Sequence, residues 1–457
     1  MSKSSLARDS AVATVALSSI LLLGAALYNG YPLTFWDTRA YVEHAGSLLP
    51  RTDRLIGYSV FIRAFSFHGS LWPVVIAQCA LVAWLLARLS RSLVGSSSGP
   101  RQLALIFFLT SVTALPWISG QLMPDVFAPI LVIALFLLVE TDARDRFEKG
   151  ALLGIVAGCV GIHLTHFPMG IGLCLVAWRV HRGADRGRAL ARVGPPLAAL
   201  VVGLVAIAGF NGVRTGRVSL ASGSDAFILG HLVESGIASK ELDEHCPERA
   251  YLLCPYRRSL PMPADDFLWV DRLDLHPWEN ADAIRVESRR LFRDSLREHP
   301  LLHARVFIDY TVAALFAVGT GEGLDGEAQY LVEPQIARYA PRDVAAYRAA
   351  RQQFSAVPLA AIRGIQTPIA IALVAVGAVA LAVLSLRGRI FRDPASRFLA
   401  FSCAALVLNA VLTGNISGVH DRYGARLAWI VAVALWALWV EGSWTRARSR
   451  SSVRALP

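Results

Sequence analysis

The sequence predicts an all-α polytopic membrane protein with about ten transmembrane helices, interfacial helices and one long outer loop. Hydrophobic residues make up 54% of the 457 positions and charged residues only 17%, whereas a soluble domain carries about 25% charged residues. The mean hydropathy is +0.47. Several runs approach the roughly 20 apolar residues that span a bilayer, and they lack the alternation of a membrane β-barrel. These features exclude a soluble enzyme, a secreted disulfide scaffold and a disordered protein.

Ten apolar runs account for the predicted helices. The first follows Lys3 and Arg8, and no small-residue cleavage site follows Tyr28, so we interpret it as an uncleaved helix rather than a signal peptide. The ten runs are residues 11–28, 71–90, 102–118, 122–140, 151–167, 168–180, 196–213, 358–386, 398–415 and 426–441.

The charges predict the topology. The formal net charge is +11, but the arginines lie in short loops between apolar runs, where the positive-inside rule places them. We therefore expect no nucleic-acid partner and a multi-pass protein of the bacterial cytoplasmic (inner) membrane. The arginine-bearing segments are 88–101, 144–149, 179–192, 387–397 and the C-terminal tail. Ten spans place all of them in the cytoplasm, and the segments between them then face the periplasm.

The chain divides into three predicted regions. These are an N-terminal transmembrane module, 1–213, with a first outer loop at 29–70; an outer region, 214–357; and C-terminal helices with a basic cytoplasmic tail, 358–457. Residues 302–319 are apolar but contain Arg305 and Asp309. If this segment crossed the membrane, the arginines of 387–397 would face outward. We therefore predict an interfacial or re-entrant helix at 302–319.

Two of the six cysteines, Cys246 and Cys254, lie in the outer region. In an oxidising periplasm this pair predicts a disulfide that closes a short loop; the alternative is two free thiols. No second cysteine pair or paired histidine completes a metal site around them. The other four cysteines lie in apolar runs and are predicted to pack there, namely Cys79, Cys159, Cys174 and Cys403.

The first outer loop contains the main catalytic candidate, Asp37. Apolar and small residues recur after it at helical spacing, which predicts an amphipathic helix on the membrane surface. Asp37 either caps this helix or supplies a carboxylate that accepts a proton from a nucleophile. Further along, Gly57 is expected to allow a turn. Arg54 is expected to bind a phosphate or a carboxylate, or else a lipid headgroup.

Other polar residues lie at the predicted outer ends of the helices. Asp125 follows Pro124, so it either starts a helix or adds a second carboxylate to the cavity of Asp37. His163 and His166 share one helical face; without a third ligand, phosphate contact or interfacial hydrogen bonding is favoured over a metal. The last such cluster lies just before the final apolar run. Its residues are expected either to bind an anionic headgroup or to form part of an interfacial belt that anchors the protein in the lipid. They are His420, Arg422, Tyr423 and Arg426.

Three of these segments resemble the GT-C superfamily of membrane glycosyltransferases, including its protein-mannosyltransferase-like and aminoarabinose-transferase-like members. Asp37, Tyr41 and Ala45 resemble the D-x-x-x-Y-x-x-x-A pattern of the first outer loop. Arg54-Leu55-Ile56-Gly57-Tyr58 resembles the R-x-x-G-Y-P turn, with Ser59 in place of proline. Arg422-Tyr423 resembles the R-Y pair before the last helix.

The resemblance implies a transferase that moves a sugar from a polyprenyl-phosphate donor to an acceptor hydroxyl, on a glycolipid, a polysaccharide or a protein. Asp37 would act as the base or position the acceptor, and Arg54, Tyr58 and the later cationic residues would bind the donor. Thr38 replaces a frequent second acid and Asp125 stands alone, so a divalent cation has only weak support and no cofactor is expected.

Two other classes remain open. A transporter or lipid flippase would bury ionisable residues at mid-membrane, and the middles of the runs contain almost none. An O-antigen polymerase or ligase also uses a large outer loop with arginines, although the acidic first-loop pattern does not point to that class.

Overall fold

The computed structural model describes residues 3–453 except 51–52, 67–68, 96–98, 141–144, 183–185, 217, 221–222 and 327–328. Side chains of residues 3–9, 329 and 442–453 are also outside this description, so the side chains of the basic tail are not placed. Within the described residues the secondary structure is helical, with no strand and one isolated bridge between Leu33 and Gln121. The predicted all-α class agrees with this architecture.

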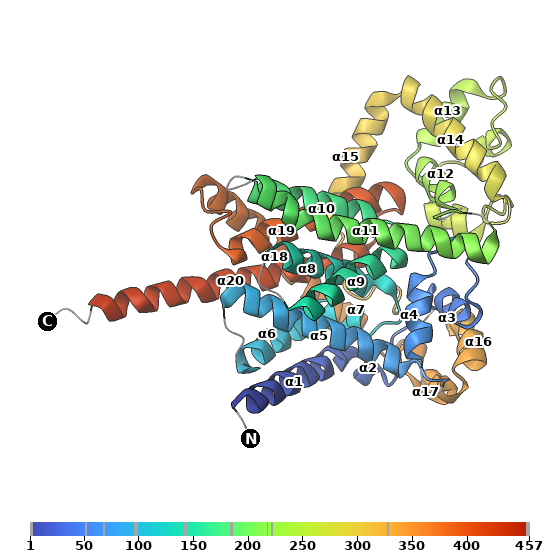
Figure 1. Ribbon diagram of the computed structural model, residues 1–457. Coiled ribbons are helices and arrows are strands. Elements are labelled where there is room, and N and C mark those ends of the chain that lie inside the picture. Colours follow the sequence, from blue (N-terminus) through green and yellow to red (C-terminus); the bar gives the residue numbers. More distant parts are fainter. Residues whose placement is uncertain are drawn as a thin grey trace.

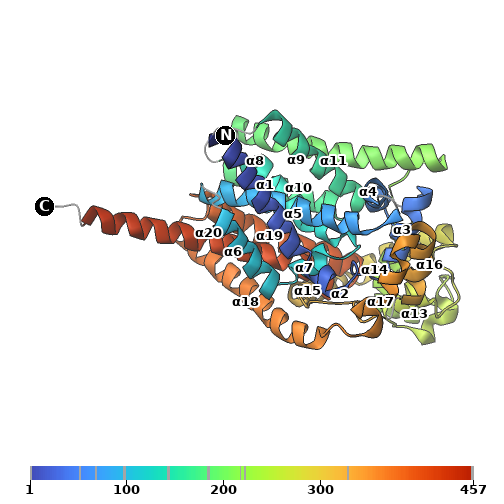
Figure 2. The same cartoon turned by 90° about the horizontal axis from the view of Figure 1, so that it is seen from below.

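Long helices pack into one bundle (Figures 1 and 2), and every helix of the bundle except the one at residues 300–316 contributes to its shared apolar core. Its helices are α1 (Lys3–Leu22), α5 (Trp72–Val94), α6 (Gly99–Val112), α8 (Phe127–Glu140), α9 (Arg146–Ile162), α10 (His166–His181), α11 (Arg186–Thr215), α15 (Pro300–Phe316), α18 (Leu359–Leu386), α19 (Pro394–Ile416) and α20 (Asp421–Val453). Helix α8 lies at the centre, because every residue from Phe127 to Val139 is buried.

Within the part of the chain that the structure describes, five helices are long and apolar enough to cross a membrane. They are α5, α11, α18, α19 and the Asp421–Glu441 part of α20. Ten spans are not confirmed, because several predicted runs form shorter or broken helices. The run at 102–118 divides into α6 and α7 (Leu115–Ser119), because Pro116 is tolerated in the first turn of a helix but not in the interior of a continuous one. Likewise, the 3₁₀ turn η2 (Pro124–Val126) precedes α8 and shortens it.

Several arginine-bearing turns meet at one end of the bundle, which we call the arginine end. Arg397 makes a bidentate pair with Glu140, and His181 lies 3.7 Å from the same carboxylate. Arg88 lies 3.8 Å from Glu148. These pairs join four turns, so the segments that the charge pattern assigns to one face do lie together.

The opposite end, the site end, gathers the first outer loop and the segments before α8, α18 and α20. The first loop forms α2 (Gly24–Asn29), α3 (Thr38–Ser47) and α4 (Gly57–Phe65), and the later segment forms α16 (Gln329–Tyr339) and α17 (Val344–Ala349). Distant residues connect there: the Tyr31 hydroxyl donates to Asp343 at 3.0 Å, and Gln352 bonds both backbone groups of Thr34.

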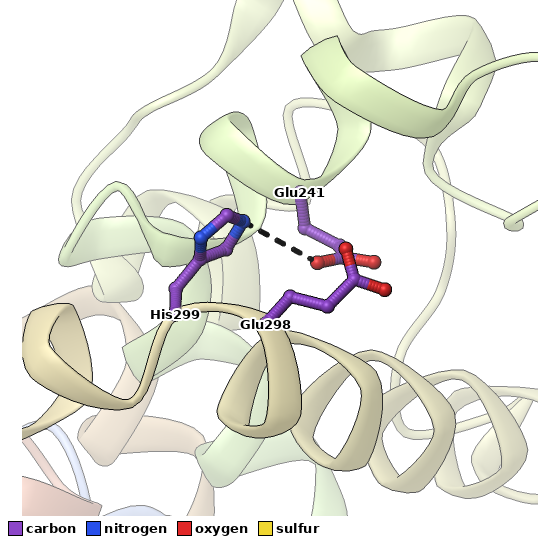
Figure 3. A group of neighbouring side chains, drawn as sticks. All are labelled: Glu241, Glu298 and His299. Carbon is purple, nitrogen blue, oxygen red and sulfur yellow. Dashed lines mark ion pairs between the residues drawn. The ribbon is translucent and has the colours of Figure 1, made fainter.

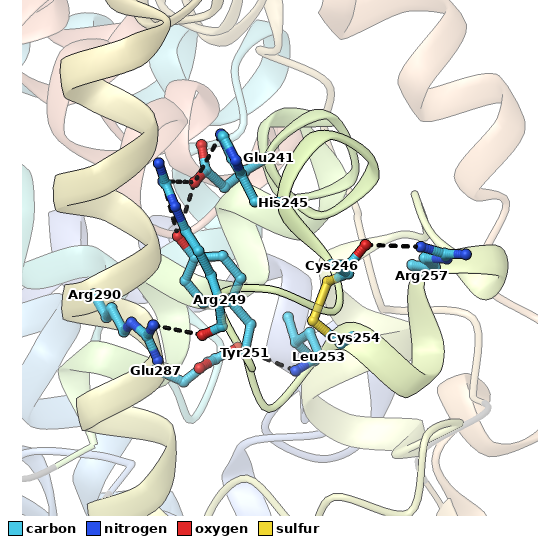
Figure 4. The surroundings of a disulfide bond; sticks show 10 residues. All are labelled: Glu241, His245, Cys246, Arg249, Tyr251, Leu253, Cys254, Arg257, Glu287 and Arg290. Atoms are coloured by element: carbon cyan, nitrogen blue, oxygen red, sulfur yellow. Dashed lines mark hydrogen bonds and ion pairs between the residues drawn. A yellow bond between two sulfur atoms is a disulfide. The ribbon is translucent and has the colours of Figure 1, made fainter.

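Residues 223–299 form a lobe whose apolar core also includes Val306 of α15. The lobe lies at the upper right in Figure 1. It contains α12 (Ser224–Glu234), α13 (Ile237–His245), η3 (Cys254–Ser259), the π-helix η4 (Asp266–Val270) and α14 (Ala281–Glu298). Cys246 and Cys254 form a disulfide with their Cα atoms 5.7 Å apart. Figure 4 shows the polar contacts around this loop, including the Leu253 amide, which donates to Glu287.

Helix α15 occupies most of the segment expected to be interfacial or re-entrant. It returns from the lobe and packs along α19, where Gly414 lets the backbone of Tyr310 approach closely. Arg305 and Asp309 form an i,i+4 pair on its exposed side, with 81% and 63% of their side chains exposed. Its position relative to a bilayer stays a prediction.

Candidate functional site

The Asp37 carboxylate lies at the centre of a charged cluster at the site end. Asp37 directly precedes α3 in the capping position, yet its side chain makes no capping hydrogen bond. Instead Oδ2 lies 2.7 Å from Nη1 of Arg54 and 3.7 Å from Nη1 of Arg422. Burial alone would raise the pKa of Asp37, but the charges of Arg54 and Arg422 outweigh it and lower the pKa below its ordinary value. Asp37 is therefore ionised and paired rather than a helix cap.

Arg54 reaches Asp37 from the segment before α4. Its guanidinium also lies 3.2 Å from Asp53 and about 5.5 Å from the Tyr41 ring centre. The expected turn at Gly57 is wrong, because this residue begins α4. Gly57 instead allows α4 to approach the backbone of α9 closely, because a Cβ at this position would lie 2.2 Å from the carbonyl oxygen of Gly161. The missing side chain thus lets α4 sit directly on the end of α9.

Asp125 and Arg426 form a second, deeper ion pair. Nη1 of Arg426 lies 3.1 Å from Oδ1 of Asp125, and both side chains are almost fully buried. Nη2 of Arg426 donates to Asn409 on α19 at 2.8 Å, and Asn409 in turn donates to the backbone carbonyl of Tyr423. Asp125 therefore neutralises a buried cation instead of only starting a helix.

Arg422 and Tyr423 lie between the two pairs at the start of α20. The Arg422 guanidinium donates to the Tyr423 hydroxyl at 3.0 Å and lies 4.4 Å from the centre of the Phe35 ring. Arg426 contacts the same tyrosine ring at 4.8 Å. Three cations and two carboxylates from four segments thus form one cluster, and two of the cations contact the Tyr423 ring.

A glycine-rich segment that the sequence interpretation missed completes the cluster. In Val318-Gly-Thr-Gly-Glu-Gly, Glu322 accepts hydrogen bonds from the Arg422 amide and the His420 ring, both at 2.8 Å. Gly323 has a φ of +69°, and a Cβ there would overlap the Phe35 ring. Repeated glycines around one acid were the available signal, because such spacing indicates a backbone in close contact.

His420 and Glu322 each shift the pKa of the other. Burial alone would lower the pKa of His420, but the hydrogen bond and negative charge of Glu322 outweigh it and raise the pKa. Burial alone would raise the pKa of Glu322, and the same contact lowers it. The pair is therefore stabilised in its charged form.

His166 and Tyr58 are buried, and Nε2 of His166 has no hydrogen-bond partner within the described residues. His166 is fully buried and bonds the Cys159 carbonyl through Nδ1 at 2.7 Å, while His163 contacts Thr165. Neither belongs to a metal-like group of side chains within the described residues. The Tyr58 hydroxyl is buried and donates to Gln78 at 2.6 Å, so it supports α4 and does not face a ligand.

A cavity of about 390 Å³ adjoins the cluster on the side of the lobe. It is bounded by Glu234, by residues 261–265 and by residues 418–420. His420 belongs to both the cavity and the cluster. The carboxylates of Glu234 and Asp265 make this cavity suited to hydroxyl or amine donors.

The arrangement can bind an anion with Arg54 and Arg422 while Asp37 accepts a proton beside it. No protein-family model matches the chain, and no curated protein or solved structure matches it either.

Proposed function

We propose that the chain is a GT-C-type glycosyltransferase that moves a sugar from a polyprenyl-phosphate donor to an acceptor hydroxyl. The observation that supports this most is the pairing of Asp37 with Arg54 and Arg422, at 2.7 and 3.7 Å. It combines a base candidate with two cations at the ends of apolar helices, where a lipid-linked phosphate would lie.

The proposed topology has ten spans in the bacterial cytoplasmic membrane, with the site end in the periplasm. The contacts at the arginine end support it, because they gather turns that are rich in cations, and such turns stay in the cytoplasm. Helices shorter than 18 residues, such as α8, would cross together with their flanking turns.

In the proposed reaction, the acceptor oxygen attacks the anomeric carbon as the bond from that carbon to the phosphate oxygen breaks. The acceptor proton passes to Asp37, and the lipid phosphate leaves with its charge neutralised by Arg54 and Arg422. Attack from the face opposite the phosphate inverts the anomeric centre. The cavity beside His420 is the proposed acceptor side.

Donor binding would also prepare the base. In the free protein both arginines lower the pKa of Asp37. A donor phosphate would draw these guanidinium groups toward itself, which weakens their hold on the carboxylate and raises its basicity. The pairing therefore supports a base that becomes active only after donor binding.

The test uses purified full-length protein and a panel of labelled polyprenyl-phosphate sugars with mixed envelope acceptors. Asp37→Asn should lower transfer at least a hundredfold, in the range typical of a lost general base, while membrane insertion is unchanged. Asp274→Asn is the matched control, because Asp274 is exposed on the lobe with 92% of its side chain accessible.

Full activity of Asp37→Asn would refute the proposed base. Movement of intact donor across vesicles without release of sugar would identify a flippase instead. Transfer from a polyprenyl-diphosphate donor alone would favour the polymerase or ligase class.

A further inference from the structure

Three glutamates and two histidines gather where α13 meets the end of α14, away from the charged cluster. Glu241, Glu244 and His245 share one face of α13 because of their i, i+3 and i+4 spacing. Glu298 ends α14, and His299 joins it to α15. Figure 3 shows Glu241, Glu298 and His299 converging from these two elements.

Two buried atoms in this group make no hydrogen bond within the described part of the chain. The Glu241 side chain is 0% exposed; its Oε1 accepts from Tyr251 at 2.7 Å, but its Oε2 has no hydrogen-bond partner. Nε2 of His299 is likewise without a hydrogen bond. A buried carboxylate oxygen that loses water and gains no hydrogen bond is costly, so Oε2 of Glu241 indicates a ligand beside it. Nε2 of His299 faces the same space, although it also forms an ion pair with Glu244.

The spacing of the donor atoms suits a four-coordinate transition metal. Nε2 of His299 lies 3.8 Å from Oε2 of Glu241 and 3.0 Å from Oε2 of Glu244. Ligand bonds of about 2.1 Å in a tetrahedron place donor atoms about 3.4 Å apart. The ligand atoms of Glu241, Glu298 and His299 all lie within 4.8 Å of one another. Small side-chain adjustments would therefore close the site.

Arg249 leaves room for the ion rather than replacing it. Its guanidinium pairs with Oε1 of Glu241 at 2.7 Å and with Oε1 of Glu298. Oε2 of Glu241 therefore remains for a metal. Oε2 of Glu298 lies 2.5 Å from Nε2 of His245, so this histidine would turn away when Glu298 binds the ion. In metal sites, the carboxylates that bind the ion are commonly held in place by hydrogen bonds from neighbouring residues that do not touch the metal.

We propose that Glu241, Glu298 and His299, together with Glu244, bind one divalent ion of the zinc class. A mixture of imidazole nitrogen and carboxylate oxygen favours such an ion over calcium or magnesium, which prefer oxygen ligands. The bound ion joins α13 to the corner between α14 and α15. It stabilises the lobe, and its binding does not depend on the proposed transferase activity.

The experiment uses the full chain in detergent after removal of metals with EDTA. Zinc chloride is titrated by calorimetry, and bound metal is counted by mass spectrometry after dialysis. The expected result is one zinc per chain and a zinc-dependent rise in unfolding temperature. His299→Gln and Glu244→Gln should each weaken binding at least tenfold and reduce that rise.

His276→Gln is the matched control, because His276 lies in an exposed group with Asp271 and Asp274. It should leave zinc binding unchanged. If His299→Gln does not elute as a folded monodisperse protein, Glu244→Gln supplies the test, since 42% of that side chain is exposed. Binding that survives in the tested ligand variant, the absence of stoichiometric zinc, or loss of binding in His276→Gln would overturn the proposal.

Discussion

Nη1 of Arg422 lies 3.7 Å from Oδ2 of Asp37, although the two residues stand near opposite ends of the chain. Arg54 lies on the same carboxylate oxygen at 2.7 Å. The two guanidinium groups share this carboxylate, and Asp53 and Glu322 lie on their other sides. An incoming phosphate would compete with Asp37 for both guanidinium groups.

Arg422→Gln should therefore weaken donor binding. A hydrogen bond to a charged group contributes about 1.5–3 kcal/mol, so we expect KM for the donor to rise at least tenfold, with a smaller effect on kcat. Initial rates at varied donor concentration measure this. Arg305→Gln, whose side chain is 81% exposed on α15, should leave KM unchanged; an unchanged KM in Arg422→Gln would remove this residue from the donor site.

Asp125→Asn should destabilise the bundle, because it leaves the buried Arg426 cation without its countercharge. Removing one partner of a buried pair costs about 3–5 kcal/mol. Asp309→Asn is the matched control, since the exposed pair of Asp309 and Arg305 contributes less than about 1 kcal/mol. Unfolding of both variants in detergent measures the difference, and equal stability would contradict the role given to Asp125.

Gly57→Ala should displace α4 from α9. The new Cβ would lie 2.2 Å from the Gly161 carbonyl oxygen, and a backbone atom cannot move aside as a side chain does. We expect a loss of about 1–3 kcal/mol together with lower transfer, because α4 follows Arg54. Gly364→Ala, where no atom lies within 4 Å, should be neutral or stabilising. Similar thermal unfolding of the two variants would show that the close contact is unimportant.

The His420–Glu322 pair predicts a pH-dependent part of stability. Because the pKa of His420 is raised, the stability from its protonation is fully present below about pH 6.5 and is lost as the pH rises through the folded-state pKa. The advantage of the native chain over His420→Gln should thus shrink as the pH rises above about 6.5. Unfolding temperatures at increasing pH measure it, and a constant difference would show that protonation of His420 does not contribute to stability in this way.

Composition and charge predicted the helical class and the grouping of the arginine-bearing turns. The solid apolar runs determine where helices form, and Arg397, Arg88 and their partners do lie at one end. Composition and charge could not predict the number of membrane-spanning helices. A hydropathy pattern counts apolar residues and does not detect helix breaks such as those before Pro116 and Pro124.

The site was predicted in part. Asp37, Arg54 and Arg422 meet in the structure, and all three stand in predicted outer loops. The partners Glu322 and Asn409 were missed, since one lies in a glycine-rich loop and the other is a lone polar residue within a helix. Gly57 was misinterpreted because a close contact depends on what packs against it, which local sequence does not reveal.

The lobe has an apolar core separate from that of the bundle, and α11 precedes it while α15 leads back to the bundle. Insertions or exchanges within 223–299 would therefore leave the packing around α8 untouched.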